Sequence, residues 1–575
     1  MSLRRTLNSR IEDLPTEIIF VVFDHLYFHE IINAFRQLNS YFQSLLQTYQ
    51  QYYLDLSVLR RIWHFEVIQQ LPKYIQQVKS LRLASREDLI IDTNQYLTLY
   101  PLNLYYSTLE LLSLTGTDVD QLESFVFKLS NFQRLKHLSL ILYRKYDSSY
   151  SMSDSRLNLL RFILLFKIKT LMFLSWNVGL DFFSRKYMTL SNEKSTIEFY
   201  EFYGMSFDDL TWLQLYTTNM KSLSIHKFTC DFGKVCRLTI ETLITLKLHD
   251  IPESMNIHQL FKQCLYLPQL NHLELEGELF KGSHIDGNHW RYLIENCVPH
   301  IKRFRFFFYI NDRIVSKPHN NIIESYKTDF WLRDKKWFVN CDYLAGHRVF
   351  LYTLPCIKPE LNYLVPYERT STSSSSAISV PVLHLDSINT NHLPSNLHFD
   401  RVRSLSIYQT DRNMTYEQLR RLINISTVEH LIFLDYINPD LFFDILKYHP
   451  TQLSIRMCEQ NFHEVLGISY GFSKKQLSTD RMAYLEKIKS FKLKWCSGSN
   501  EGALESCAKF SKLEALEIDL TMSVAKLQYI INSFTKLSFL KMCQGDDINK
   551  LIESGSQWRR LVHKRVNSAD WIWFD

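Results

Sequence analysis

The stretch that decides the fold reads MKSLSI at 220–225, LITLKL at 243–248, LNHLEL at 270–275 and IKRFRF at 301–306. Each copy follows the pattern L-x-x-L-x-L, with other large apolar residues replacing some leucines, and successive copies begin 23, 27 and 31 positions apart. Alternating apolar residues are typical of a short strand with one face in a core. A pattern that returns at this spacing indicates a repeat architecture.

Similar copies extend outward in both directions, beginning at Val78, Leu109, Leu135, Ile168, Val402, Val428, Ile488, Leu513 and Leu537. Between copies, apolar residues recur with helical spacing, as at Leu122, Phe125, Val126 and Leu129, at Ile257, Leu260, Phe261 and Cys264, and at Trp290, Leu293, Ile294 and Cys297. Because one strand and one helix cannot bury their apolar faces alone, consecutive units are expected to stack. The predicted fold is α/β, a curved solenoid with a parallel concave sheet and convex helices.

These residues resemble leucine-rich repeat proteins of the long, helix-containing type, over about residues 75 to 545. This family usually places Asn or Cys three residues after the last leucine of each copy. That position holds Thr117, Tyr143 and Ile251 in three of the copies, and only Cys496 fits. An irregular horseshoe is therefore expected. The alternative is a doubly wound α/β domain, which carries Gly-rich turns and does not repeat one six-residue pattern.

The composition is that of an ordinary folded protein, with 46% hydrophobic and 22% charged residues among 575. Glycine and proline number only 14 each, which disfavours Gly-rich nucleotide-binding folds. The net charge of +6 is small for a nucleic-acid-binding protein of this length. The ten cysteines form no CxxC pair, so we expect no zinc site, no disulfide framework and no cofactor. No signal peptide or membrane-spanning run is visible, which predicts a cytoplasmic or nuclear protein.

Residues 11–50 predict three short helices before the repeats. The first opens at Leu14-Pro15-Thr16-Glu17-Ile18, because Pro is favoured in a first turn and Glu complements its positive end. Its apolar face contains Ile18, Val22 and Leu26, the second helix contains Ile31, Phe35 and Leu38, and the third contains Phe42, Leu45, Leu46 and Tyr49. Such a small core normally needs a partner surface, so an apolar face is expected to remain exposed.

This segment resembles the F-box motif. The matching residues are Leu14, Pro15, Glu17, Ile18, Phe23 and Leu26 at its opening, and Leu38, Asn39, Phe42 and Leu45 at its closing helix. It departs from the family at Phe42, where Trp is frequent, and at the aromatic residues Tyr27 and Phe28 of the first connection. The resemblance implies docking onto a Skp-family adaptor, and through it onto a cullin scaffold, by Leu14, Pro15, Glu17, Ile18, Val22, Leu26, Leu38 and Phe42. The alternative is a plain helical cap of the solenoid.

Two segments interrupt the repeats. Residues 307–379 contain no clean copy, are rich in aromatic residues and end in a Ser/Thr run at 371–376, which is expected to be a flexible loop. Residues 546–575 are predicted to be a terminal cap or tail. The remaining predicted parts are a flexible N-terminus at 1–10, the F-box unit at 11–50, a linker helix at 51–75, and repeats at 76–306 and 380–545.

A protein partner is expected on the concave sheet, whose outward residues are Ser224, Lys247, Glu274, Arg303, Arg305, Ser406, Lys492, Glu517 and Lys541. Their charges are mixed, which suits a protein better than a nucleic acid. Trp331 and Trp337 belong to a residue type that dominates binding hot spots. The insertion is therefore predicted to project beside Arg303 and Arg305 and to form the main partner site with them. The alternatives are that the tryptophans pack internally and that the outward residues serve only solubility.

One catalytic pattern is present, because residues 467–471 read GISYG, the G-x-S-x-G turn that would expose Ser469. Asn461, His463 and Glu464 interrupt the buried strand that must precede such a turn, which favours coincidence. His25 and His29 share helical spacing but lack a third metal ligand. The resemblance to an F-box followed by leucine-rich repeats implies a non-catalytic substrate receptor of a ubiquitin ligase, and we predict this function. The alternatives are a repeat scaffold that binds protein or RNA without a ligase, and a serine hydrolase.

Overall fold

The computed structural model describes the chain in segments. They are residues 11–56, 61–84, 93–101, 105–117, 129, 132–142, 163, 167–175, 194–230, 237–279, 286–311, 320–344, 348–358, 360–364, 368–373, 377–386, 397–408, 414–434, 438–449, 453–458, 465, 479–494, 510, 512–518, 533, 536–543, 561–566 and 569–574. The chain divides into two compact units. Unit 1 comprises Met1–Ile251, Gln259–Leu273 and Cys297–Ile301, and unit 2 comprises Pro252–His258, Glu274–Asn296 and Lys302–Asp575.

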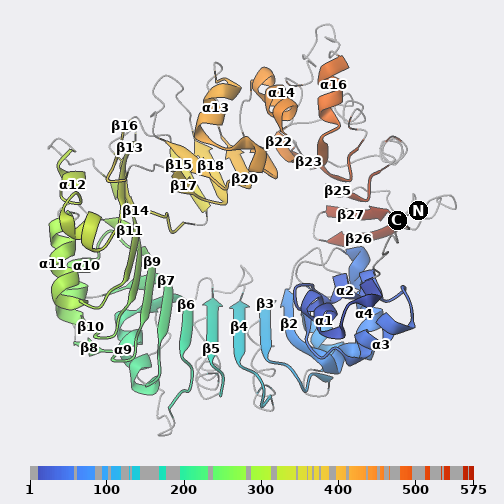
Figure 1. Ribbon diagram of the computed structural model, residues 1–575, viewed down its shortest axis with the longest axis horizontal. Coiled ribbons are helices and arrows are strands. Elements are labelled where there is room, and N and C mark those ends of the chain that lie inside the picture. Colours follow the sequence, from blue (N-terminus) through green and yellow to red (C-terminus); the bar gives the residue numbers. More distant parts are fainter. Residues whose placement is uncertain are drawn as a thin grey trace, which may run out of the picture. The chain divides into compact units, whose positions relative to one another are not determined.

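Unit 1 begins with short helices, as the sequence predicted (Figure 1). They are the 3-10 turn η1 (Ile11–Asp13) and the helices α1 (Thr16–Asp24), α2 (Phe28–Phe35), α3 (Ser40–Thr48) and α4 (Arg61–Tyr74). Pro15 stands directly before α1 and Glu17 lies in its first turn. The side chain of Asn39 caps α3 by accepting a hydrogen bond of 3.1 Å from the amide of Phe42. No helix in the described segments is long and apolar enough to cross a membrane.

A parallel sheet follows in unit 1, and its strands lie side by side in the order in which they occur in the chain (Figure 1). They are β1 (Tyr52–Asp55), β2 (Val78–Ala84), β3 (Leu111–Thr117), β4 (His137–Leu142), β5 (Thr170–Ser175), β6 (Phe199–Ser206), β7 (Ser222–Thr229) and β9 (Thr245–Ile251). The same repeat position pairs across neighbouring strands, as where Leu112 lies opposite Leu138, and Leu138 opposite Leu171. The other described elements include α5 (Thr93–Leu99), α9 (Phe207–Tyr216), and a small parallel pair of β8 (Leu238–Thr239) and β10 (Leu265–Tyr266).

The first strands of unit 2 follow β11 (His272–Leu279), which begins in unit 1 and ends in unit 2. In order across the sheet they are β12 (Arg303–Asn311), β14 (Arg348–Thr353), β13 (Val339–Leu344) and β16 (Glu368–Ser371). Antiparallel pairing joins β12 to β14, β14 to β13 and β13 to β16. The helical elements of unit 2 are α11 (Gly287–Cys297), whose last residue belongs to unit 1, α12 (Asn320–Glu324) and the π turn Phe330–Asp334. The helix α10 (Ile257–Gln259) begins in unit 2, and the π turn Leu260–Cys264 that continues it belongs to unit 1.

A second sheet of unit 2 is again parallel over most of its width. Its strands are, in order, β15 (Glu360–Leu364), β18 (Val382–Asp386), β20 (Ser404–Ile407), β21 (His430–Phe433), β22 (Leu453–Cys458), β23 (Ile488–Lys494), β24 (Ala515–Ile518), β25 (Phe539–Cys543), β27 (Ala569–Phe574) and β26 (Leu561–Val566). The last two form a hairpin that pairs antiparallel with β25. A separate short pair joins β17 (Ala377–Ser379) to β19 (His398–Asp400).

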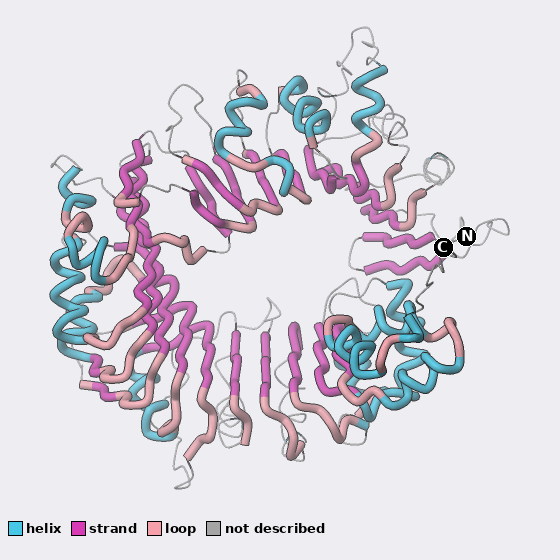
Figure 2. Tube along the Cα trace, viewed as in Figure 1, coloured by secondary structure: helices cyan, strands magenta, loops and turns pink. Residues whose placement is uncertain are grey.

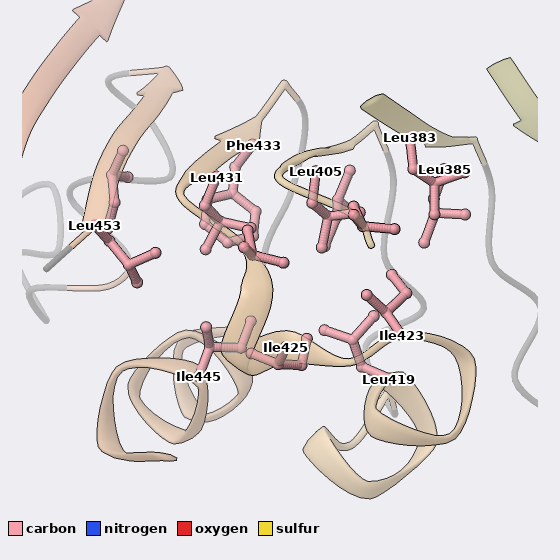
Figure 3. Close-up of a cluster of buried hydrophobic side chains, with 14 of the residues drawn as sticks. Leu383, Leu385, Leu405, Leu419, Ile423, Ile425, Leu431, Phe433, Ile445 and Leu453 are labelled. Atoms are coloured by element: carbon pink, nitrogen blue, oxygen red, sulfur yellow. The ribbon is translucent and has the colours of Figure 1, made fainter. Parts of the chain in front are cut away.

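Helices cover one face of this second sheet (Figure 2). They are α13 (Tyr416–Leu422), α14 (Pro439–Tyr448) and α16 (Thr479–Leu485). Leu405 and Leu431 extend from their strands toward Leu419 and Ile445 of the helices, and together they form a continuous apolar core (Figure 3). Removing this surface from water is the main force that holds strand and helix together.

The prediction of a mixed α/β chain with a parallel sheet is confirmed. The first residue of every copy of the pattern is buried, with at most 7% of its surface exposed. Helical spacing at 290–297 corresponds to α11, whereas most of the predicted helix at 122–129 lies outside the described residues. Three further copies were not predicted. In Tyr49-x-x-Tyr52-x-Leu54 and Ile197-x-x-Tyr200-x-Phe202, Tyr or Phe replaces leucine. The third, Val380-x-x-Leu383-x-Leu385, directly follows the interruption at 307–379.

The structure departs from the sequence predictions at two segments. Part of the predicted linker helix at 51–75 is the strand β1, which pairs with β2 because its aromatic residues occupy the leucine positions. Within the Ser/Thr run expected to be flexible, Ser371 belongs to β16 and its hydroxyl donates to Oδ1 of Asn340 at 2.6 Å. The amide of Thr372 donates to the carbonyl of Val339 at 3.0 Å, so the neighbouring strand holds Ser371 and Thr372. Residues 374–376 of the run lie outside the described residues.

Candidate functional site

An exposed apolar surface lies on the N-terminal helices of unit 1. We name it the apolar N-terminal surface, and its members, each 40–55% exposed, are Ile11, Leu14, Ile18, Val21, Val22 and Leu38. The side-chain amide of Asn39 donates to Oε1 of Glu12 at 2.5 Å, which holds the loop that carries Leu38 against η1. This hydrogen bond links the connection before α3, which carries Leu38, to the η1 turn, which carries Ile11.

An aromatic core beneath this surface sets its orientation. Phe23 packs edge-on against Phe35 with ring centroids 5.0 Å apart, and Phe35 lies 5.3 Å from Phe42. Tyr49 packs 5.3 Å from Phe23 and its hydroxyl donates to Asp24 at 2.6 Å. Burial first and the Asp24 carboxylate second raise the pKa of Tyr49, so the phenol stays protonated as the donor. Because α1 turns Phe23 inward, its opposite side must face solvent.

The residues that the F-box resemblance implied for adaptor binding differ in their exposure. Leu14, Pro15, Glu17, Ile18, Val22 and Leu38 are exposed, and Leu26 is half-buried. Phe42 is fully buried against Phe35, so it supports the surface from inside and does not contact a partner in this conformation. Sequence reasoning missed Ile11 and Val21. Ile11 precedes Leu14 by three positions and Ile18 by seven, a helical spacing that was available as a signal.

The fifth residue of each L-x-x-L-x-L copy faces outward from the unit 1 sheet, and these residues form a row across the strands. In register from β2 to β9, the row is Arg82, Ser113, Ser139, Met172, Glu201, Ser224 and Lys247. Ser224 thus lies between Glu201 and Lys247, as its predicted place on the outward face requires. Beside them Nε2 of His226 lies 2.7 Å from Oε1 of Glu201, and the rings of His226 and His249 stack 5.3 Å apart.

A second row of charges in unit 1 was not recognised in the sequence. It comprises the residues that follow the first position of six consecutive copies, and we name it the strand-start row: Lys79, Glu110, Lys136, Lys169, Glu198 and Lys221. Nζ of Lys136 lies 2.7 Å and Nζ of Lys79 lies 3.7 Å from the Glu110 carboxylate. The carboxylate of Glu198 lies 2.9 Å from Lys221 and 3.9 Å from Lys169.

In unit 2, the predicted basic pair lies on an accessible strand. Arg303 is exposed and Arg305 half-exposed on β12, while the alternate residues Phe304 and Phe306 are buried. Burial first, and then the charge of Arg303, lower the pKa of Arg305, whereas Glu274 raises it. Glu274 itself is buried, so its expected role as an accessible contact does not fit this structure.

The two tryptophans of the insertion face inward. Trp331 is fully buried and its indole N–H donates to the carbonyl of Gly287 at 3.1 Å. Trp337 is also buried, with its ring 5.9 Å from that of Trp331. The prediction that Trp331 and Trp337 contact a partner is therefore corrected. Both side chains are buried inside an aromatic cluster and are not accessible to a partner. Arg303 and Arg305 remain as the accessible part of that predicted site.

The second sheet of unit 2 has its own outward row: His384, Ser406, Ile432, Arg456, Lys492 and Glu517, in register from β18 to β24. The side chain of Lys541, also predicted to face outward, lies outside the described part of the chain. Ser406 is buried, so its predicted contact role does not fit either. Lys492 and Glu517 form an ion pair of 2.5 Å. Half-exposed pairs of this kind contribute little to stability and leave a mixed surface for a partner.

The described residues contain no site for the serine hydrolase alternative. Ser469 and its flanking glycines lie outside the described residues. His29 is half-buried, and burial first lowers its pKa, while Glu30 and Asp55 raise it. Among the described side chains, no group of three or more His, Cys, Asp and Glu is placed to hold a metal ion.

Comparison with known proteins assigns no family to this chain. No protein-family model matches it, and no curated protein matches its sequence.

Proposed function

We propose that this chain is the substrate-recognition subunit of an SCF-type ubiquitin ligase, in which the N-terminal helices bind a Skp-family adaptor. In this role the chain is not itself an enzyme. The observation that carries the proposal is the apolar N-terminal surface. It gathers six aliphatic side chains that are 40–55% exposed within a segment of about 30 residues.

The chemistry of this surface suits a protein partner. Burying several half-exposed aliphatic side chains at about 25 cal/mol per Å² gives a favourable term of several kcal/mol before the cost of association. Glu12 and Glu17 lie among these residues and are exposed. An apolar centre with a polar rim is the arrangement of specific protein interfaces.

The sheets favour a solenoid of the leucine-rich repeat type for the substrate-binding part. In each parallel sheet the strand order follows the chain without the reversal that a doubly wound domain requires. The same repeat position of every copy lies in one row, so a partner would meet an array of side chains at regular intervals. Ser224, Lys247, Arg303, Arg305, Lys492 and Glu517 are the proposed target-binding residues that the described structure leaves at least partly accessible.

The decisive test is capture of a purified Skp-family adaptor by the full chain. We expect Ile18→Glu/Val22→Glu to lower capture about tenfold or more, because the charges would be buried unpaired in the interface. Both residues are exposed, so the double variant should keep the wild-type circular dichroism spectrum.

Leu215→Glu is the control, since Leu215 is an exposed aliphatic residue of unit 1 that lies on α9 and does not belong to the apolar N-terminal surface. It should capture the adaptor as the wild type does. If the wild type captured no adaptor, or if the Ile18/Val22 variant captured as much as the control, the ligase proposal would be abandoned.

A further inference from the structure

The strand-start row of unit 1 is a continuous array. Backbone hydrogen bonds link each member to the next: the amide of Glu110 donates to Lys79, Lys136 to Glu110, Lys169 to Lys136, Glu198 to Lys169 and Lys221 to Glu198, all at 2.7–2.9 Å. Adjacent strands are about 4.8 Å apart, so six members extend over roughly 24 Å. An extended peptide of about seven residues has this length.

Lysine dominates the exposed part of this row. Four lysines face two glutamates, which leaves a net charge of 4 − 2 = +2. The side chains of Lys136, Lys169 and Lys221 are 57%, 58% and 46% exposed, whereas those of Lys79, Glu110 and Glu198 are 30%, 29% and 23% exposed. The carboxylates are therefore recessed between protruding ammonium groups, and an approaching molecule meets cations first.

The centre of the row has two adjacent cations. Lys136 and Lys169 are neighbours, with no glutamate of the row between them. The two ammonium groups also act on His137. Burial first, and then the charges of Lys136 and Lys169, lower the pKa of its imidazole, while Glu110 raises it. Lys136 already has Glu110 at 2.7 Å and Lys169 has Glu198 at 3.9 Å, each on the side away from the other lysine. Between two neighbouring cations a further anion is attracted to both.

Two pairs at the corresponding positions of unit 2 are arranged differently. Arg403 lies 4.0 Å from Glu429, and Lys489 lies 3.1 Å from Glu514, so each of these cations has a carboxylate of its own, whereas in unit 1 two lysines share each glutamate. The copy that begins at Ile301 places a further cation, Lys302, at this position. These pairs are also strand-start neighbours, since the amide of Glu429 donates to Arg403 and that of Glu514 to Lys489. The sharing of one carboxylate between two lysines therefore distinguishes the strand-start row of unit 1 from these two pairs of unit 2.

We propose that the strand-start row of unit 1 binds an extended acidic segment of a partner protein, with one carboxylate between Lys136 and Lys169. The two recessed glutamates favour a peptide over a nucleic acid. A phosphate backbone places a charge at every nucleotide and would meet Glu110 and Glu198, whereas a peptide can place uncharged residues there. This deepens the proposed recruitment of a target, because it names the class of segment that would be recruited.

The test measures fluorescence anisotropy of labelled peptides with the full chain and no adaptor. The probe is a peptide of about 12 residues that alternates Glu and Ser, compared with the same peptide containing Gln. We expect the Glu peptide to bind about tenfold more tightly than the Gln peptide at low salt, and to lose this advantage at about 0.3 M NaCl.

Variants locate the site. Lys136→Gln/Lys169→Gln should weaken binding of the Glu peptide about five- to tenfold, whereas Lys136→Arg/Lys169→Arg should retain it. Glu110→Gln/Glu198→Gln should strengthen it about two- to fivefold, a gain that misfolding cannot imitate. Lys489→Gln in unit 2 is the matched control and should change affinity less than about twofold.

Equal binding of the Glu and Gln peptides would overturn this inference, as would an unchanged affinity of Lys136→Gln/Lys169→Gln. Equal weakening by Lys489→Gln would show that any surface lysine suffices. If a uridine oligonucleotide bound more tightly than the Glu peptide, the ligand of the row would be RNA and the peptide proposal would be wrong. Adaptor capture by Lys136→Gln/Lys169→Gln should equal that of the wild type, so failure here is distinguishable from failure of the ligase proposal.

Discussion

Replacing Arg369 with Met is expected to destabilise the antiparallel strands of unit 2 by about 3–5 kcal/mol. Nε of Arg369 lies 3.4 Å from Oδ1 of Asp342, and neither side chain has any exposed surface. The hydroxyl of Tyr352, also buried, donates to Oδ2 of Asp342 at 2.7 Å. Without the guanidinium, the Asp342 carboxylate would lose its counter-charge where water cannot replace it.

Hydrogen exchange is the appropriate measurement, because it reports the opening of particular strands in a chain of two units. Amides of Val339–Leu344 and Arg348–Thr353 should exchange about a hundredfold faster or more in the variant. Asp342→Asn/Arg369→Met is the matched control. It removes both charges but leaves an acceptor for Tyr352, so it should be closer to the wild type than the single variant. Exchange in Arg369→Met within about threefold of the wild type would show that the pair does not support these strands.

Replacing Trp331 with Ala is expected to cost about 3–5 kcal/mol, the range for removing a fully buried aromatic side chain. Its ring lies 4.8 Å from that of Tyr326 and 5.6 Å from that of Phe330. The packing leaves no spare space, since a Cβ added at Gly287 would lie 2.4 Å from the carbonyl oxygen of Ser325. The surrounding backbone therefore cannot easily collapse into the cavity that Ala would leave.

Exchange of the α11 and Phe330–Asp334 amides measures this loss. Lys335→Ala is the control from the same turn, because its ammonium lies 5.3 Å from the Trp337 ring at the exposed edge of the cluster. It should cost less than about 1 kcal/mol. If Trp331→Ala exchanged like the wild type but lost a partner, Trp331 would be a binding residue after all, as its residue type first suggested.

The repeat could be recognised from the sequence because its signal is local. Leu138 and Leu140 enclose Ser139 in the printed chain, and strand geometry alone sends the leucines to one face and the serine to the other. The leucines are indeed buried and Ser139 is half-exposed. The same argument failed to find β1, because Tyr52 plays the role of a leucine there and its hydroxyl donates to the carbonyl of Leu46 at 2.6 Å.

The candidate surfaces were only partly predictable. Ile18 and Val22 were expected on an apolar face, and they are exposed because Phe23 occupies the small core. Phe42 has the same apolar character and a matching position in the motif, yet it is buried. Which of several apolar residues faces a partner depends on how the helices pack together, and that packing is not visible in the spacing of any single helix.

By itself, the sequence determined the mixed α/β class, the parallel sheet and the three N-terminal helices, since each follows from the periodicity of adjacent residues. Only the tertiary structure decided which outward residues are accessible. It buries Glu274 and Ser406, turns Trp331 inward, and places Lys136 beside Lys169 although 33 positions separate them. The physical reason is that exposure and charge proximity depend on residues brought together from distant parts of the chain, whereas the direction of a side chain along a strand depends only on its neighbours.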